Sequence, residues 1–370
     1  MSYVCKAARE AVSVPLFTAG TLAPDSALEL IESGVVDFTN MGRALIADPQ
    51  LPNKLMEGRP EDVRPCLRCN EYCIGRIWNR HTKLSCAVNP QAMEEVRFEI
   101  KKTDAPKNVV VIGGGPAGME AARVAAIEGH HVVLYEKNDR LGGVMGDICT
   151  ASFKQNIKKL TTWYQTQLQK LNVEVHLNTE ITGEEDFLDT CDKIIIGCGA
   201  KPIMPKIPGI DNDNVVTMLD AHRDHTRLKG ENIVVCGGGA SGLDGALEMA
   251  SELGKKVTVV EMQPQCGKDV FFINQITLFN KLAQADVTLM TNTKVIAMDA
   301  EGLTVECADG TTKKIPADTI VNAFGMRPDL SVVDKIKAKY HIKTRVVGDS
   351  NALGKIGEAI RDGFYAATSL

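Results

Sequence analysis

The feature that most constrains the fold of this chain is an internal duplication. Residues 108–137 and residues 232–262 each contain an apolar strand, a glycine-rich turn, a helix and a second strand that ends in glutamate. A strand that leads through glycines directly into a helix is typical of a βαβ unit in a parallel sheet. The repeat therefore predicts an α/β fold with two Rossmann-like domains.

The first glycine-rich turn has the spacing GxGxxG and follows the apolar strand 109–112. Gly113 allows the tight turn, Gly115 lets the backbone approach a pyrophosphate, and Gly118 lets the helix pack closely on the strand. The free N–H groups and the positive dipole at the helix start favour the pyrophosphate. Glu136 ends the next strand, where an acid can accept hydrogen bonds from ribose hydroxyls.

The second turn repeats this pattern with Gly237, Gly239 and Gly242, and Glu261 ends its second strand. A single GxGxxG is weak evidence, because glycine turns before helices also arise from packing alone. Two copies with the same strand, helix and acid make that explanation much weaker. The Glu261 carboxylate would repel a 2′-phosphate and so favours NADH over NADPH, although an exposed glutamate can also merely cap the sheet.

Further motifs resemble those of flavoproteins of the two-dinucleotide, disulfide-reductase type: Arg140-Leu-Gly-Gly143, Gly197-Cys-Gly199 and the late Gly348-Asp349. The resemblance implies FAD at the first fingerprint and NADH at the second, in a domain inserted within the FAD domain. Cys149 has no second cysteine nearby, so thiol–disulfide exchange is not expected. The residues implied for FAD are Gly113, Gly115, Pro116, Ala117, Gly118, Glu136, Lys137, Arg140, Gly143, Gly199 and Asp349, and those for NADH are Gly237, Gly239, Ser241, Gly242 and Glu261.

Four of the 11 cysteines are clustered in a polar segment as C-x2-C-x3-C-x12-C, at Cys66, Cys69, Cys73 and Cys86. Four thiolates this close in sequence can hold a tetrahedral zinc ion or an iron–sulfur cluster. Zinc sites usually have two CxxC pairs, so the spacing favours a cubane cluster while leaving zinc open. The other cysteines are scattered, several of them in apolar runs, and are most simply small core residues.

The motifs around these cysteines resemble the NADH:flavin oxidoreductases related to 2,4-dienoyl-CoA reductase, enoate reductase and trimethylamine dehydrogenase. The matches are MGRAL at 41–45, ADP at 47–49, RPC at 64–66 and CAVNP at 86–90. The resemblance implies that Cys66, Cys69, Cys73 and Cys86 hold a [4Fe-4S] cluster. In that family the cluster connects FAD to FMN, and the FMN lies in a (β/α)8 barrel that also binds the substrate.

Residues 1–50 are typical of one βαβ unit, with strands at 14–19 and 35–41 and a helix at 26–33. A complete barrel needs about 250 residues, so this segment matches only its last two strands. Gly20, Gly42 and Arg43 at the strand ends would supply an incomplete FMN site, and no catalytic residue is assigned. Two strands cannot close a barrel, so we expect this segment to bind a separate barrel polypeptide or a second copy. Alternatively, it is a cap on the cysteine segment without an FMN role.

The predicted division is a barrel remnant at 1–50, an iron–sulfur segment at 51–105, an FAD domain at 106–225 and 316–370, and an NAD(H) domain at 226–315. A formal charge of −5 argues against general nucleic-acid binding. Neither a signal peptide nor an apolar stretch long enough for a membrane span is evident, and the many cysteines then suit a reducing compartment, so we expect a cytoplasmic protein.

The resemblance implies an NADH-dependent flavoprotein oxidoreductase that reduces a small-molecule substrate. Electrons would pass from NADH through FAD and the [4Fe-4S] cluster to an FMN barrel, which reduces an activated C=C bond of the 2-enoate or 2,4-dienoyl-CoA type. This chain would be the electron-input half of that system. The alternative is a non-catalytic, nucleotide-binding electron-transfer subunit of a trimethylamine dehydrogenase-like complex.

Overall fold

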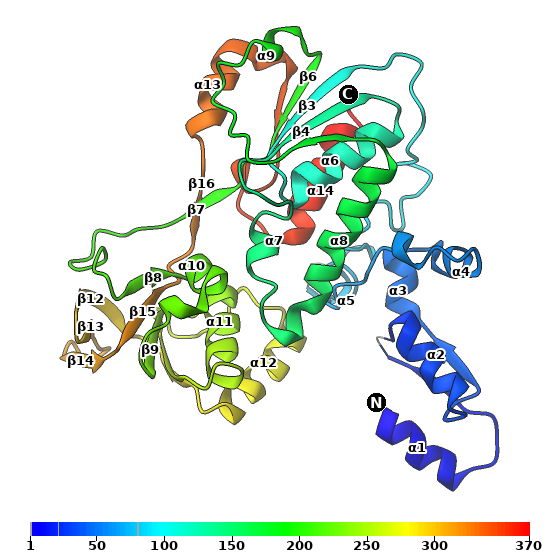
Figure 1. The fold of residues 1–370 in the computed structure, drawn as a ribbon. Coiled ribbons are helices and arrows are strands. Elements are labelled where there is room, and N and C mark those ends of the chain that lie inside the picture. Colours follow the sequence, from blue (N-terminus) through cyan, green and yellow to red (C-terminus); the bar gives the residue numbers. More distant parts are fainter. Residues whose placement is uncertain (1, 21, 80) are drawn as a thin grey trace.

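The computed structural model describes residues 2–20, 22–79 and 81–370. Figure 1 shows two α/β lobes, joined by extended segments, and an N-terminal arm that projects away from both. The predicted fold class, with two Rossmann-like units, is confirmed. Throughout the described ranges, every helix is too short or too polar to traverse a lipid bilayer.

The first lobe contains a five-stranded sheet in the order β17-β6-β3-β4-β5, with all neighbours parallel. Its central strand β3 (Asn108–Ile112) is the apolar strand predicted before the first fingerprint. The other strands are β4 (His131–Tyr135), β5 (Glu174–His176), β6 (Lys193–Ile196) and β17 (Thr344–Val346). Its helices are α6 (Pro116–Ile127), α7 (Val144–Asp147), α8 (Gln155–Lys170), α9 (Phe187–Thr190), α13 (Ser331–Tyr340) and α14 (Ile356–Ala367).

Helix α6 lies at the centre of this lobe, between the sheet and α14. Its apolar residues are almost all buried. Most of them are alanines and one position is glycine, so the helix can pack closely against its neighbours. A Cβ atom on Gly363 of α14 would lie 2.0 Å from the carbonyl oxygen of Ala117. The two helices therefore meet at backbone contact, and α14 fixes the start of α6 against the sheet.

The second lobe repeats this plan with a parallel sheet in the order β11-β10-β9-β15-β8. Its strands are β8 (Val215–Thr217), β9 (Asn232–Cys236), β10 (Lys256–Val260), β11 (Thr288–Met290) and β15 (Thr319–Asn322). An antiparallel sheet adds β12 (Lys294–Asp299), β13 (Gly302–Glu306) and β14 (Thr312–Pro316). The helices are α10 (Met218–Arg223), α11 (Ala240–Ser251) and α12 (Phe272–Gln284).

Two strands of this sheet lie outside the interval 226–315 predicted for the NAD(H) domain. Strand β15 pairs with the central strand β9, and β8 pairs with β15 at the edge of the sheet. The second lobe therefore begins before β8 and extends through β15. The crossing between lobes is made by an antiparallel pair, β7 (Ala200–Pro202) and β16 (Met326–Pro328), which runs between them in Figure 1.

The N-terminal arm contains the predicted βαβ unit, with β1 (Phe17–Ala19) and β2 (Phe38–Asn40) as an isolated parallel pair. Helix α1 (Ser2–Ala11) precedes it and was not predicted, and α2 (Pro24–Glu32) links the two strands. Phe17 and Phe38 are 72% and 63% exposed. The cysteine segment follows, with helices α3 (Gly42–Ala47), α4 (Leu51–Met56) and α5 (Ile74–Asn79). Short 3-10 turns lie at Pro60–Asp62, Ser152–Lys154, His225–Arg227, His341–Lys343 and Gly348–Ser350.

Candidate functional site

The first fingerprint forms a turn that only glycine can make. Gly113 has a φ of +103°, and a Cβ atom there would lie 2.3 Å from the carbonyl oxygen of Gly197. A Cβ atom on Gly118 would lie 1.9 Å from the carbonyl oxygen of Gly113. The two glycines thus hold the start of α6 directly against the carboxyl ends of β3 and β6, as the sequence pattern predicts.

Gly115 lies in the same turn but is open on its outer side. Its backbone is extended, with φ −74° and ψ −179°, and no atom lies within 4 Å of the position of a Cβ atom. Gly115 also caps α6, whose first N–H groups face this open side. A space beside a helix N-terminus, kept free of any side chain, fits the pyrophosphate of FAD.

A cavity of about 1410 Å³ extends from this turn between the two lobes. It exceeds the range of about 300–1,000 Å³ that is usual for one small ligand, and so leaves room for a dinucleotide and a second ligand. Eleven of the predicted cofactor-binding residues line it, namely Gly113, Gly115, Pro116, Ala117, Glu136, Lys137, Arg140, Gly143, Gly199, Ser241 and Asp349.

The remaining predicted residues lie elsewhere. Gly118 is buried in the packing of α6. Gly20 and Gly42 follow β1 and β2 in the N-terminal arm, at one edge of that strand pair, and Arg43 begins α3 beside Gly42. The second fingerprint borders the cavity through Ala240 and Ser241, while the other residues predicted there, Gly237, Gly239, Gly242 and Glu261, do not line it.

The two glutamates that end the fingerprints make the same contacts in both lobes. Glu136 accepts hydrogen bonds from the N–H of Gly114 at 2.7 Å and from the N–H of Asn138 at 2.8 Å. Glu261 accepts from the N–H of Gly238 at 2.7 Å and from Gln263 at 2.8 Å. Each carboxylate is therefore fixed against its own glycine turn. Asn138 also donates its side-chain amide to Oε1 of Glu136 at 2.6 Å, so Oε2, which accepts from Gly114, is the oxygen of Glu136 that retains a lone pair for a ribose hydroxyl.

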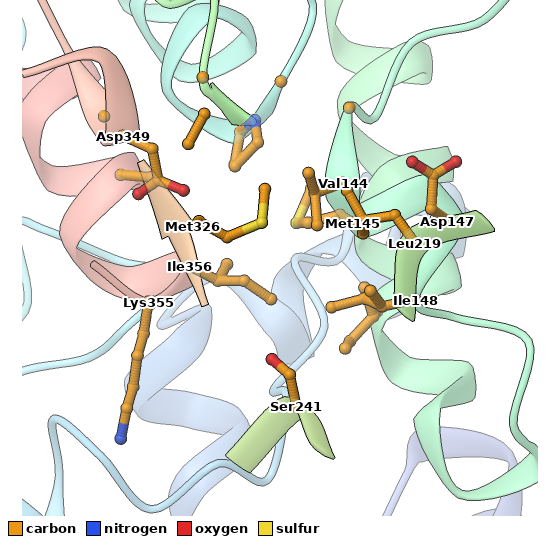
Figure 2. Close-up of a pocket in the computed structure, with 18 of the residues that line it drawn as sticks. Val144, Met145, Asp147, Ile148, Leu219, Ser241, Met326, Asp349, Lys355 and Ile356 are labelled. Carbon is orange, nitrogen blue, oxygen red and sulfur yellow. The ribbon is translucent and has the colours of Figure 1, made fainter. Parts of the chain in front are cut away.

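The middle of the cavity is apolar, which the sequence did not predict. Figure 2 shows side chains from α7, α10, β16 and α14 lying around one space, with Asp349 to one side of it. Burial raises the pKa of Asp349 above its ordinary value, although its carboxylate accepts a hydrogen bond from the N–H of Gly354. An apolar wall of this kind excludes water from a bound ring system. Its residues are Val144, Met145, Ile148, Leu219, Met326 and Ile356.

A buried carboxylate at the edge of the cavity joins the two lobes, and no motif identified it. Asp147 accepts hydrogen bonds from Arg140 at 2.6 Å and from Arg223 of α10 at 2.7 Å. Arg140 was predicted from its motif as a cofactor contact, and here its guanidinium also forms this bridge. A second link is made by Thr150 of the first lobe, whose hydroxyl lies 3.2 Å from Nδ1 of the buried His222. Within the second lobe, His222 pairs with the buried Glu248 at 2.9 Å.

The four clustered cysteines, Cys66, Cys69, Cys73 and Cys86, line a second, smaller cavity together with Arg43. Burial raises the pKa of the Cys69 thiol to about 12 and also raises that of Cys66 and Cys86. A bound metal would have to displace these protons. Within the described ranges, no three side chains of His, Cys, Asp or Glu meet the geometry of a single-ion site.

The two cavities share a wall. Leu67, Cys69, Tyr72 and Ala87 line both of them. The Tyr72 hydroxyl donates a hydrogen bond to Glu358 at 2.6 Å, at the start of α14. The cysteine segment therefore packs directly on the helix that follows Asp349, and Cys69 is the one of the four cysteines that lines both cavities.

Comparison with known proteins agrees with this geometry. The model of the pyridine nucleotide-disulphide oxidoreductase family matches residues 107–352. The chain belongs to this family. A domain of this family implies binding of FAD and NAD(P)H, so the coarse cofactor prediction is confirmed.

The relatives also confirm the resemblance to the flavin oxidoreductases. The chain is 36% identical over 374 residues to a bilirubin reductase of Mediterraneibacter gnavus, covering 100% of this chain and 57% of the relative. It is 34% identical to a cinnamate reductase of Clostridium sporogenes, covering 98% of this chain and 54% of the relative. A solved complex of 2-naphthoyl-CoA reductase with 2-naphthoyl-CoA superposes with a TM-score of 0.94 at 32% identity, covering 100% of this chain and 56% of that one. The chain thus spans little more than half the length of these proteins.

A substitution at Gly115 should weaken cofactor binding without affecting folding. Gly115→Val should leave the protein folded, because the extended backbone accepts any residue, but should fill the space proposed for the pyrophosphate. We expect FAD to bind at least about tenfold more weakly, a loss of about 1.4 kcal/mol, so that less flavin stays bound through gel filtration. Bound flavin would be measured by absorbance after gel filtration, and folding by circular dichroism.

Gly42→Val is the matched control, because a Cβ atom at Gly42 also meets nothing within 4 Å, and Gly42 does not line the cavity. It should retain the wild-type flavin content. Full FAD content in Gly115→Val would contradict the placement of the pyrophosphate.

Proposed function

We propose that this chain is the electron-input part of an NADH-dependent C=C reductase. In this proposal FAD binds at the first fingerprint, NADH at the second, and a [4Fe-4S] cluster binds to the four clustered cysteines. The observation that carries the proposal is the wall shared by the two cavities, with Cys69 lining both. A cysteine in that position puts a cluster ligand directly beside the flavin cavity.

The bound groups would supply the redox chemistry: FAD accepts a hydride from NADH, and an iron–sulfur cluster passes electrons on singly. The chain itself binds and orients them. The turn at Gly113 and Gly115 would hold the pyrophosphate, and the apolar residues of Figure 2 would exclude water from the space between the lobes. Asp349 lies beside that space for a hydrogen bond to the flavin side chain. No acid or base of this chain is required for the hydride step.

The acceptor of the electrons would lie outside the described chain. We propose an FMN-containing barrel that reduces an activated C=C bond, because relatives named for cinnamate and 2-naphthoyl-CoA are nearly twice as long. Phe17 and Phe38 are exposed on β1 and β2, whose sheet has only these two strands. A barrel polypeptide, or a second copy, would cover these side chains, and Gly20, Gly42 and Arg43 would form part of the FMN site. Thiolate ligands suit the reducing cytoplasm, where we place the protein.

The cluster assignment makes the first prediction. Anaerobically purified protein should contain about four irons with matching sulfide, and Cys69→Ser should lose them while retaining FAD, because separate segments hold the two groups. Iron, zinc and flavin would be measured together in one sample. Cys307→Ser is the control, since Cys307 lies outside the thiol cavity. Zinc in place of iron would overturn the cluster.

The nucleotide preference is the second prediction. Glu261 is fixed at the strand end where the adenosine ribose is recognised, so its charge should disfavour a 2′-phosphate. We expect kcat/KM to be at least about tenfold higher for NADH than for NADPH, and Glu261→Gln should narrow that ratio. The control is Glu231→Gln, because Glu231 is exposed and directly precedes β9, at the opposite edge of the sheet from Glu261. This change should leave the ratio of the two kcat/KM values unchanged. Equal use of both nucleotides by the wild type would contradict this role.

The decisive test compares two acceptors. The purified, FAD-loaded chain should reduce ferricyanide or a viologen with NADH, because in this proposal FAD and NADH bind to two lobes that border one cavity. It should not reduce cinnamate or a dienoyl-CoA, since residues 1–50 supply only two barrel strands. Both would be assayed anaerobically at steady state. Stoichiometric alkene reduction would show that the active site is misplaced, and absence of dye reduction would favour the nucleotide-binding electron-transfer subunit.

A further inference from the structure

The two fingerprints differ in what faces their middle glycine. At Gly115 no atom lies within 4 Å of a Cβ position, whereas at Gly239 the nearest atoms are the carboxylate oxygens of Asp269, at 3.6 and 3.8 Å. The backbones are otherwise alike, since Gly239 caps α11 with φ −74° and ψ 177°. The place that is open in the first lobe is therefore filled by a carboxylate in the second.

The same carboxylate binds the start of α11. Both oxygens of Asp269 lie 3.0 Å from the N–H of Ala240, which donates to them. A negative charge is favourable there, because the first N–H groups and the dipole of a helix attract anions. These are the groups that a dinucleotide pyrophosphate uses in a fold of this type. Asp269 thus makes the contacts that the pyrophosphate of a bound nucleotide would make.

Hydrogen bonds to the backbone hold the segment around Asp269 in this position. Lys355, the N-cap residue of α14, donates a hydrogen bond to the backbone carbonyl of Asp269 at 2.6 Å and another to Glu71 at 2.8 Å. Gly267, two residues earlier, donates its N–H to the carbonyl of Gly238 in the fingerprint turn at 2.7 Å. The backbone is anchored on both sides, so the Asp269 side chain has to rotate away before an anion can enter.

We infer that Asp269 is an internal competitor for the pyrophosphate subsite of the second fingerprint, which sets how tightly NADH and NAD⁺ bind. The inference rests on the proposed function, because it takes the second fingerprint as the nucleotide site. Its ligand class is any nucleotide with an adenosine diphosphate moiety. Since NADH and NAD⁺ carry the same pyrophosphate, the competitor weakens substrate and product alike and favours release of the product.

The test is binding to the FAD-loaded protein without turnover. Calorimetric titrations with ADP-ribose, NAD⁺ and adenosine would be compared for the wild type, Asp269→Asn and Asp269→Ala. Removing the charge should lower the Kd of ADP-ribose and NAD⁺ by a common factor of about 2 to 30, the range of a charge at a helix N-terminus. The Kd of adenosine should not change, because adenosine has no phosphate.

Asp309→Asn removes the same charge from the turn between β13 and β14, where Asp309 accepts hydrogen bonds from Thr311 of the same turn. It should bind all three ligands as the wild type does. If Asp269 had a purely structural role, Asp269→Asn and Asp269→Ala would instead lower the melting temperature and leave the Kd of each ligand unchanged.

The outcomes distinguish this inference from the function on which it rests. If the wild type and both Asp269 variants bind ADP-ribose with the same Kd, Asp269 does not compete with the pyrophosphate, but the second fingerprint is still a nucleotide site. If none of them binds ADP-ribose, the second fingerprint is not a nucleotide site, and the proposed function falls with it. Binding that is detectable only in the variants would support the competitor in its strongest form.

Discussion

Close backbone contact at the glycine turns is the constraint on which the rest of the molecule depends. In both lobes the first helix begins where a Cβ atom would lie about 2 Å from a carbonyl oxygen, as at Gly118 and Gly242. On the far side of α6, Gly363 allows the same approach by α14. Because no side chain separates these elements, the carboxyl ends of the strands, the start of α6 and the middle of α14 meet in one place.

That meeting point also positions the cysteine segment. Helix α14 begins beside Asp349, and its first turn packs on Tyr72 so closely that a Cβ atom on Gly357 would be 2.6 Å from the ring. Tyr72 lies between Cys69 and Cys73 in sequence, so the packing of one ring sets the distance from the thiols to the larger cavity. Any larger residue at Gly357 would push the two cavities apart.

The sequence predicts the repeated βαβ units well because their signals are local. Apolar strands such as β3 and β9, and the glycines that follow them, are determined by residues adjacent in the chain. The limits of the second lobe are not predicted, since β8 has three residues and belongs to the sheet only through its pairing with the distant β15. The two-stranded crossing of β7 and β16 escapes prediction for the same reason.

In the candidate site, too, residues within local motifs were predicted from the sequence, whereas residues that act through distant partners were not. Motif residues such as Gly115 lie where the pattern places them, although their cofactor roles stay predictions. Asp147 and Asp269 were missed, because each acts through a partner far away in sequence and stands in a segment without periodicity. A lone aspartate carries no signal of its own, whether it ends a short helix, as Asp147 does, or lies in a turn, as Asp269 does. Only the tertiary structure shows which helix or arginine it contacts.

Two carboxylates lie at the interface between the lobes: Asp147 is buried between two arginines, whereas Asp269 occupies a site that a phosphate could take. Asp147 is 4% exposed and bonds to Arg140 of its own lobe and to Arg223 of the other. Removing one partner of a buried carboxylate is costly, but here the other arginine remains, so the second lobe can separate without leaving the charge unpaired. At the opposite edge, Lys355 holds Asp269 through its carbonyl group and leaves the carboxylate free to exchange for an incoming phosphate. On this inference a nucleotide would displace the Asp269 carboxylate from Ala240, while Asp147 would stay paired with Arg140 of its own lobe.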